Sequence, residues 1–266
     1  MAGTLHIVAT PIGNLGDLGE RAKQTLADVD LVVAEDTRRT GRLLKSFGIE
    51  APLRSMFDGN ERARTPGVVR DLLAGRSVAL VSDPGYLLVR ACVEEGIDVR
   101  VVPGPSAAIA ALVVSGLPTD RFVFEGFLPR TSAQRRTRLA ALALDPRTLV
   151  LYEAPRRVAG LLRDIGVELG DRRVAVCREL TKLHERVVRG SVSEVLEAVG
   201  DEPLRGEVVV VVEGDREGAP RDLESALAMA GSLIAEGTRK RDAARLVAAE
   251  TGVGANEIYR GLIGEG

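Results

Sequence analysis

The segment Pro103-Gly104-Pro105-Ser106-Ala107 constrains the fold of this chain most, because it joins a hydrophobic strand to an apolar helix. Proline holds such a turn rigid, and glycine lets the main chain approach a ligand closely. A loop of the same type, Thr10-Pro11-Ile12-Gly13-Asn14, follows the strand expected at residues 5–9. Ligands in open α/β sheets bind at the carboxyl ends of strands, where both loops should lie. The two loops therefore predict an α/β enzyme with a small-molecule site built from backbone.

The first part of the chain alternates apolar runs with amphipathic segments, which is typical of a mainly parallel sheet. Strands are expected at Leu31–Ala34, Ser77–Val81 and Val99–Val102. Helices are expected at Thr37–Phe47, Tyr86–Glu95 and Ser106–Ser115, the last so apolar that we expect it packed inside the molecule. The segment Ser115–Asp120 resembles a domain boundary.

The rest of the chain has a different pattern. Only two clear helices, near Pro155–Leu169 and Ser193–Val199, separate strands expected at Phe122–Phe127, Thr148–Tyr152, Arg173–Cys177, Arg186–Arg189 and Glu207–Glu213. A mixed α/β domain fits this pattern better than continued βα repetition. Helical segments follow at 222–236, 239–250 and 255–263. For a chain of 266 residues we therefore expect an N-terminal domain at 1–117, a C-terminal domain at 118–218 and a helical appendage at 219–266.

Composition excludes several classes of protein. The two cysteines, Cys92 and Cys177, are too few for a disulfide framework or a zinc cluster, so we expect no metal and a cytoplasmic location. No apolar run approaches the length of a membrane span, and because Met1–Thr4 leads directly into a strand we expect no signal peptide. The chain has two histidines, His6 and His184, and it lacks a P-loop, a Gly-x-Gly-x-x-Gly fingerprint and a nucleophile elbow.

Three charged clusters are candidates for chemistry. Glu35, Asp36, Arg38 and Arg39 follow a predicted strand, although Asp36 alone would also serve as a helix cap. Glu179 and Lys182 follow another strand, where an ordinary salt-bridged strand end is the alternative. The segment 130–138 contains Arg130, Arg135, Arg136 and Arg138 and no acidic residue, which favours a phosphate-backbone contact over a solvated helix face.

Seven segments in order resemble the tetrapyrrole methylase superfamily, and within it the ribosomal RNA small subunit methyltransferase I family. They cover nearly the whole chain and read ATPIGNLGD at 9–17, AEDTRRTGRLL at 34–44, NERAR at 60–64, VPGPSAAIAAL at 102–112, SGLPTDRFVFEGFLPR at 115–130, RELTKLHERVVRG at 178–190 and GEVVVVVEG at 206–214. The resemblance implies two α/β domains of the tetrapyrrole methylase type with the cofactor cleft between them, plus a short C-terminal helical segment.

The resemblance also implies a function: transfer of a methyl group from S-adenosylmethionine to the ribose 2′-hydroxyl of a cytidine in the decoding region of 16S ribosomal RNA, by a homodimer. The implied cofactor-binding residues are Thr10, Pro11, Gly13, Asn14, Asp83, Pro103, Gly104, Pro105, Ser106 and Ala107. The implied RNA-binding residues are Arg38, Arg39, Arg130, Arg135, Arg136 and Arg138. Asp36 is the preferred group to accept the hydroxyl proton, with Glu35, Glu61, Glu125, Glu179 and Lys182 as alternatives.

One departure from the family is large. The family has a hallmark close to Ser-Asp-Ala-Gly-Thr-Pro-x-x-Ser-Asp-Pro-Gly, whereas here Ser82-Asp83-Pro84-Gly85 directly follows the strand. The Ala-Gly-Thr-Pro turn that lies beside the cofactor is thus absent. A flexible loop left out of the sequence is the explanation we favour, against a true deletion or an engineered one.

Two rival functions differ in class. A methylase of the same fold acting on a tetrapyrrole or on a translation factor would share the two loops. A non-catalytic RNA-binding protein would depend on Arg239–Ile263, which resembles a helix-turn-helix with a turn at Thr251-Gly252-Val253. A plain helical hairpin would produce the same pattern. Cofactor binding separates the enzyme from the binding protein.

Overall fold

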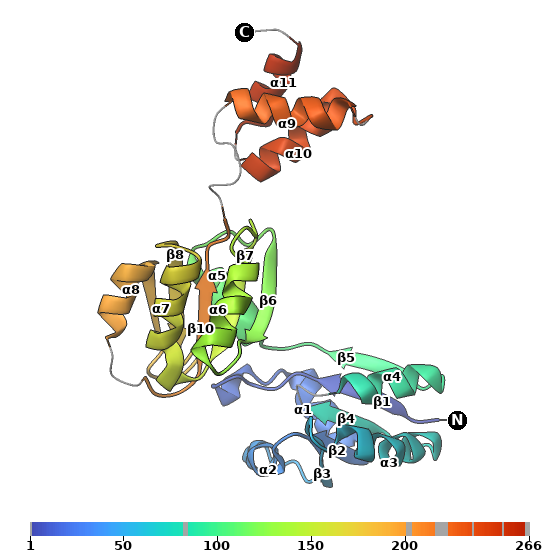
Figure 1. Cartoon of the computed structure of the whole chain (residues 1–266). Coiled ribbons are helices and arrows are strands. Elements are labelled where there is room, and N and C mark those ends of the chain that lie inside the picture. The colour runs from blue at the N-terminus through green and yellow to red at the C-terminus, as the bar shows by residue number, and fades with distance from the viewer. Residues whose placement is uncertain are drawn as a thin grey trace. The chain divides into compact units, whose positions relative to one another are not determined.

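Short runs of valine, leucine and isoleucine form two β-sheets, one in each of two units of the chain. The computed structural model describes residues 2–81, 85–200, 204–215, 223–235, 237–251 and 253–263. The units are Met1–Ala107, called unit 1, and Ala108–Gly266, called unit 2 (Figure 1). The expected divisions at 117 and 218 stay predictions. Residue Asp83 lies outside the described residues.

Unit 1 contains a parallel sheet, as the alternating pattern predicts. In its described part the strand order is β3-β2-β4-β1-β5, and every pair is parallel. The strands are β1 (Thr4–Val8), β2 (Leu31–Ala34), β3 (Leu53–Ser55), β4 (Val78–Val81) and β5 (Asp98–Val102). The sequence pattern did not predict β3, which has three residues, all half-buried.

Helices cover both faces of this sheet. They are α1 (Glu20–Asp28), α2 (Thr37–Ser46), α3 (Glu61–Leu73) and α4 (Tyr86–Glu94), with a short 3-10 helix η1 (Leu15–Asp17). Alternate strand residues point to opposite faces, so Val33 packs with α3 and α4 while Val32 packs with α1 and α2. Burial on both faces explains why the strands are almost entirely apolar.

The order of the strands creates a switch point between β1 and β4. The connection from β1 runs through α1 to β2, and the connection from β4 runs through α4 to β5 on the other side of β1. The two connections therefore leave neighbouring strands in opposite directions. In open α/β sheets a ligand crevice lies at the carboxyl ends of such a pair.

Unit 2 contains a mixed sheet, again as expected. Its order among the described residues is β6-β7-β10-β8-β9, with β6 and β7 parallel and the other pairs antiparallel. The strands are β6 (Phe122–Phe127), β7 (Thr148–Glu153), β8 (Arg173–Arg178), β9 (Arg186–Ser191) and β10 (Val208–Val212). The five valines of β10 are all buried, which fits the centre of a sheet that is covered on both faces.

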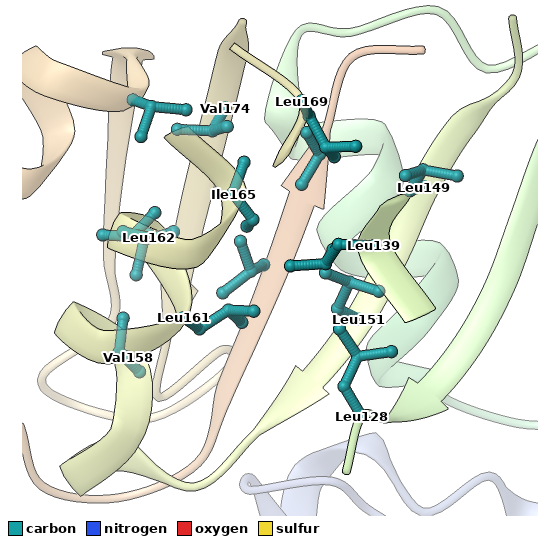
Figure 2. Close-up of a cluster of buried hydrophobic side chains, with 14 of the residues drawn as sticks. Leu128, Leu139, Leu149, Leu151, Val158, Leu161, Leu162, Ile165, Leu169 and Val174 are labelled. Atoms are coloured by element: carbon teal, nitrogen blue, oxygen red, sulfur yellow. The ribbon is translucent and has the colours of Figure 1, made fainter. Parts of the chain in front are cut away.

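Three helices cover one face of this sheet: α6 (Ser132–Ala141), α7 (Val158–Glu168, preceded by the 3-10 helix Pro155–Arg157) and α8 (Val192–Val199). Figure 2 shows the core between them, with Leu139 of α6 and Leu161 of α7 facing Leu151 of β7. The expectation of only two helices among these strands was wrong. The arginine-rich segment forms α6, whose Leu139 is fully buried.

The opposite face of this sheet contacts α5 (Ala107–Ser115). The Cys177 thiol of β8 donates to the Ala111 carbonyl at 3.8 Å, and Arg189 Nε of β9 donates to the Val114 carbonyl at 2.9 Å. The expectation that α5 is packed inside the molecule was only half right. Ile109 and Val113, one turn apart on its other side, are 47% and 65% exposed.

The C-terminal helices α9 (Leu223–Ala235), α10 (Lys240–Thr251) and α11 (Ala255–Ile263) form where the sequence predicts them. Each contacts the other two around a small core of alanines with Val247 and Ile258. Because α9 packs against both α10 and α11, the cluster is more than a two-helix hairpin. A helix-turn-helix function stays a prediction.

Glu61, the first residue of α3, starts the neighbouring helix α4. Its side chain is buried, and Oε1 accepts hydrogen bonds from the backbone N–H groups of Leu87 at 2.9 Å and Leu88 at 3.3 Å. The N-cap residue Gly85 has no side chain with which to do this. Glu61 thus satisfies N–H groups of α4 that would otherwise lack a partner. This role argues against Glu61 as a proton acceptor.

Replacing Glu61 therefore tests the start of α4. Glu61→Ala leaves one buried and one partly buried N–H group unpaired, so we expect a loss of about 1–3 kcal/mol in unfolding free energy and faster hydrogen exchange at Leu87 and Leu88. Glu61→Gln keeps an acceptor and should lose less. Glu20→Ala is the matched control, because Glu20 also lies in a first helical turn but its side chain is 87% exposed. Equal stability of the Glu61→Ala and Glu20→Ala variants would contradict this role.

Candidate functional site

The loops after β1 and β5 meet at one edge of the unit 1 sheet. Since parallel strands end at the same edge, β1 and β5 bring 10–14 and 103–107 together. The Ala9 N–H donates to the Val102 carbonyl at 3.1 Å. A Cβ on Gly104 would lie 3.0 Å from the Ala9 Cβ, so glycine lets the second loop pack this closely on the first without displacing Ala9. The sequence-based grouping of the two loops is confirmed within unit 1.

These two loops offer mainly backbone to a ligand. Gly13, Asn14, Pro103, Gly104 and Ser106 are exposed, whereas Thr10, Pro11, Pro105 and Ala107 are half-buried. The Asn14 side chain accepts from the Gly16 N–H at 3.0 Å and so caps η1. The loops lie next to the switch point, and the exposed residues Gly13 and Gly104 have no side chain that would cover the main chain. This donor set fits a small polar cofactor held by backbone hydrogen bonds, although cofactor binding by the individual residues stays a prediction.

Asp36 caps helix α2, as the alternative interpretation of its cluster predicts. Its Oδ1 accepts from the backbone N–H groups of Arg38 at 2.9 Å and Arg39 at 3.1 Å. Hydrogen bonds from the backbone of Arg39 and then Arg38 lower the pKa of the Asp36 carboxyl. Asp36 is therefore ionised at neutral pH but is a weak base. Glu35 beside it is exposed, as are Arg38 and Arg39.

Charged residues of unit 2 also gather at one edge of a sheet. Glu153 at the end of β7 and Arg178 at the end of β8 both pair with Val208 at the start of β10. The end of β6 lies beside them, because Phe127 pairs with Tyr152. This edge therefore contains the segments 128–130, 153–157, 178–182 and 206–207.

Glu179, Lys182 and Glu207 form a charge network at this edge. Lys182 Nζ lies 2.7 Å from Glu179 Oε1 and 3.1 Å from Glu207 Oε2, and the Glu207 N–H donates to Glu179 Oε1 at 3.0 Å. Glu179 has a φ of 53°, which is uncommon for a residue other than glycine. Gly206 makes room for it, because a Cβ there would lie 2.0 Å from Glu179 Oε1.

The hydrogen bonds of this network determine the protonation states of Glu179 and Lys182. The hydrogen bond from Lys182 lowers the pKa of the Glu179 carboxyl. Burial opposes the charge on Lys182, but its hydrogen bonds to Glu179 and Glu207 outweigh that effect and raise its pKa. Both side chains are therefore charged at neutral pH. Lys182 is a fixed cation rather than a proton acceptor, and Glu179 is a weak base.

The expectation that Arg130–Arg138 lacks acidic partners was wrong, because partners come from distant parts of the chain. Arg136 Nε lies 2.6 Å from Glu168, and Arg138 makes two hydrogen bonds of 2.8 Å to Glu125. Arg135 pairs with Asp164 at 2.5 Å, and its side chain is only 7% exposed. Arg135 therefore holds α6 to α7 and has little surface for a phosphate. Arg130 is exposed, and RNA binding by this segment stays a prediction.

Sequence reasoning missed the buried pair of Glu153 and Arg157. Glu153 Oε1 accepts from Arg157 at 2.5 Å and from the Ala154 N–H at 2.6 Å, and its side chain is fully buried. Its Oε2 and the Nε of Arg157 have no hydrogen-bond partner among the described residues. The only signal in the sequence is an acidic residue that ends an apolar strand.

Other features do not suggest a competing site. A hollow of about 550 Å³ lies where α2 ends and β3 begins, and its lining includes Leu44, Gly48 and Leu53. Strand β3 is the outermost strand on the side of the sheet away from β1 and β5, so the hollow is remote from the two loops. In the described part of the chain, no three His, Cys, Asp or Glu side chains are placed to hold a metal ion. None of the described helices is both long and apolar enough to span a bilayer.

Comparison with known proteins identifies the class. The family model of the tetrapyrrole (corrin/porphyrin) methylases matches residues 4–196. A solved uroporphyrin-III-C-methyltransferase from Thermus thermophilus superposes with a TM-score of 0.56 over 79% of this chain and 94% of its own, at 22% identity. The chain is thus a methyltransferase with the tetrapyrrole methylase fold, a class that uses S-adenosylmethionine.

Relatives with higher sequence identity identify the family within this class. Proteins described as ribosomal RNA small subunit methyltransferase I from Xylella fastidiosa and Escherichia coli O157:H7 are each 46% identical over 97% of this chain. They are matched over 98% and 94% of their own length. The chain belongs to the ribosomal RNA small subunit methyltransferase I family. The Xylella alignment spans 274 positions against a chain of 266, so that relative has residues without a counterpart here.

The two thiols provide a chemical test of the site assignment. Burial raises the pKa of the Cys92 thiol to about 11 and that of the Cys177 thiol to about 12. Both stay protonated at pH 8, so we expect no reaction of the native protein with Ellman's reagent and two reactive thiols after denaturation. Cys92→Ser and Cys177→Ser assign any signal. Rapid reaction of Cys177 in the native protein would show an activated nucleophile and contradict the backbone-built site.

Proposed function

We propose that this protein transfers the methyl group of S-adenosylmethionine to the ribose 2′-hydroxyl of a cytidine in 16S ribosomal RNA, in the decoding region of the small subunit. The observation that carries the proposal is the 46% identity, over 97% of the chain, to proteins described as ribosomal RNA small subunit methyltransferase I. The loops at the switch point support it, because they suit a cofactor bound by backbone groups. A cytoplasmic homodimer that binds the small subunit or its RNA is part of the proposal.

The reaction requires few catalytic side chains. The bound cofactor supplies an activated methyl group on its sulfonium, so neither a metal nor a covalent enzyme intermediate is needed. Loops 10–14 and 103–107 would hold the cofactor, together with Asp83. The protein must then align the ribose hydroxyl with the methyl group and accept its proton.

Asp36 is the proposed proton acceptor, with Glu35 as the next choice. Both residues follow β2 at the same edge of the sheet as the two loops. The lowered pKa keeps Asp36 ionised, as a base must be, at the cost of basicity. Among the arginines, Arg38, Arg39, Arg130, Arg136 and Arg138 are the proposed phosphate contacts.

Two alternatives share parts of this arrangement. A methylase acting on a tetrapyrrole or a translation factor would have the same fold, but the solved uroporphyrin enzyme is only 22% identical to this chain. A non-catalytic RNA-binding protein becomes the better proposal if the short connection after β4 abolishes cofactor binding. That connection is Ser82-Asp83-Pro84-Gly85.

Calorimetric titration with S-adenosylmethionine, on protein of confirmed intact mass, tests the cofactor site. We expect binding by the wild-type chain and its loss in Gly104→Leu, because a side chain there collides with Ala9 and displaces the loop. Gly19→Leu is the matched control, since a Cβ at Gly19 meets no atom within 4 Å. Unchanged affinity of the Gly104→Leu variant would place the cofactor elsewhere, and no binding by the wild type would favour the RNA-binding alternative.

Methyl transfer to small ribosomal subunits separates the two roles of Asp36. Asparagine caps a helix about as well as aspartate but cannot accept the proton. We expect Asp36→Asn to keep the fold and cofactor affinity and to lose roughly 100- to 10,000-fold in rate. Asp36→Ala should lose the cap as well, and so melt at a lower temperature. A wild-type rate in Asp36→Asn would leave Asp36 as a cap only and transfer the proposal to Glu35.

A further inference from the structure

Four of the eight aromatic residues of this chain lie together on β6 and β7. Phe122, Phe124 and Phe127 are 37%, 50% and 65% exposed. Phe124 and Phe127 each pack edge-to-face on Tyr152, with ring centroids 4.9 Å and 5.6 Å apart. These four residues are called the aromatic strip. Three exposed phenylalanines in a chain this poor in aromatic residues require an explanation beyond core packing.

A β-bulge keeps the strip on one face of the sheet. Residues three apart on a regular strand point to opposite faces, so Phe124 and Phe127 would be separated. The register shifts between Phe124 and Gly126, so that Phe124 pairs with Val150 and Phe127 with Tyr152, which share a face. Gly126 has a φ of 62°, which fits this irregularity. Bulges of this kind re-aim side chains, often near functional sites.

The surroundings of the strip suit an anionic chain with flat groups. In the described residues β6 is an edge strand, so nothing in the sheet continues beyond it. Exposed Arg121 and Arg130 stand at its two ends. The segment 122–130 contains one acidic residue, Glu125. Two hydrogen bonds from the Arg138 guanidinium compensate the negative charge of its carboxylate. At one end Asp120 offsets the charge of Arg121, so the net positive charge of the strip lies at the Arg130 end, while the Arg121 guanidinium still offers hydrogen-bond donors.

The spacing of the rings also matches extended nucleic acid. Residues two apart on a strand are separated by about 6.8 Å. This spacing applies to Phe122 and Phe124, and it is twice the roughly 3.4 Å rise of a stacked strand, so these two rings can take successive unstacked bases. Exposed rings with flanking arginines are the usual platform for single-stranded RNA.

We propose that the aromatic strip stacks against unpaired bases of the RNA substrate while Arg121 and Arg130 contact its phosphates. This inference rests on the proposed ribosomal RNA substrate and adds the surface that receives it. Methylation of a ribose 2′-hydroxyl requires that the nucleotide be accessible, so a surface that favours unstacked strand assists the reaction.

Fluorescence anisotropy with labelled dodecauridylate tests the strip directly, because stacking on rings is tolerant of sequence. We expect the double variant Phe124→Ala, Phe127→Ala to bind at least about tenfold more weakly. Its affinity for S-adenosylmethionine should not change. Leu144→Ala is the control, because Leu144 is also in unit 2 and is 84% exposed, but it lies outside the strip. Its affinity for dodecauridylate should equal that of the wild type.

Two conservative variants distinguish base stacking from a contact between two copies of the chain. Phe127→Tyr keeps a ring and should bind like the wild type, whereas Phe127→Leu keeps only apolar area and should bind more weakly. Equal binding by the leucine and wild-type proteins, or a fall in sedimenting mass in the double alanine variant, would overturn the proposal in favour of a protein interface.

Different measurements would contradict the aromatic strip as an RNA surface and the proposed methyl transfer. No binding of dodecauridylate by the wild type overturns the aromatic strip as an RNA surface, even if the wild type methylates small subunits. If the wild type transfers no methyl group to small subunits, the proposed function fails, and the strip loses the substrate on which it rests. For an active enzyme we expect the double alanine variant to raise KM and to leave kcat near the wild-type value.

Discussion

Parallel pairing of β1 with both β4 and β5 is the constraint on which the candidate site depends. Strands that run in the same direction end at the same edge, so the loops after them gather without any side chain directing them. The close contact between Gly104 and Ala9 then fixes two of these loops against each other. The result is a backbone surface whose shape follows from the sheet and from one residue without a side chain.

The charged residues near the strand ends already have partners, and this limits the chemistry. Asp36 holds the start of α2, Lys182 joins two glutamates, and Arg135 ties α6 to α7. Groups that are held in such pairs are poor acids and bases, but they hold helices and loops in position. Transfer of an activated methyl group needs alignment more than it needs strong acid–base catalysis, so this arrangement and the assigned class agree.

The sequence predicted those elements that have continuous apolar runs. The expected bounds of Leu31–Ala34 and Phe122–Phe127 match the observed strands, and the alternative role of Asp36 as a helix cap was confirmed. The three-residue β3 gave no usable period, and α6 was not recognised because its buried face contains Arg135. The partners of the arginines lie up to 32 residues away, and only the fold brings them together. The aromatic strip could not be predicted either, because the alternation of apolar and polar residues does not show where a β-bulge occurs.

The hydrogen bonds of Glu61 have a consequence for how the first turn of α4 is held. A helix usually takes its first hydrogen-bond acceptors from the residues just before it, so changing that connection alters the start of the helix. Here two N–H groups in the first turn of α4 take their acceptor from another helix, because both donate to Glu61 of α3. The start of α4 is therefore tied to α3 as well as to the strand that precedes it in the chain. A contact between two helices thus does the work that a capping side chain does elsewhere, and it gives α4 a point of attachment outside its own connection.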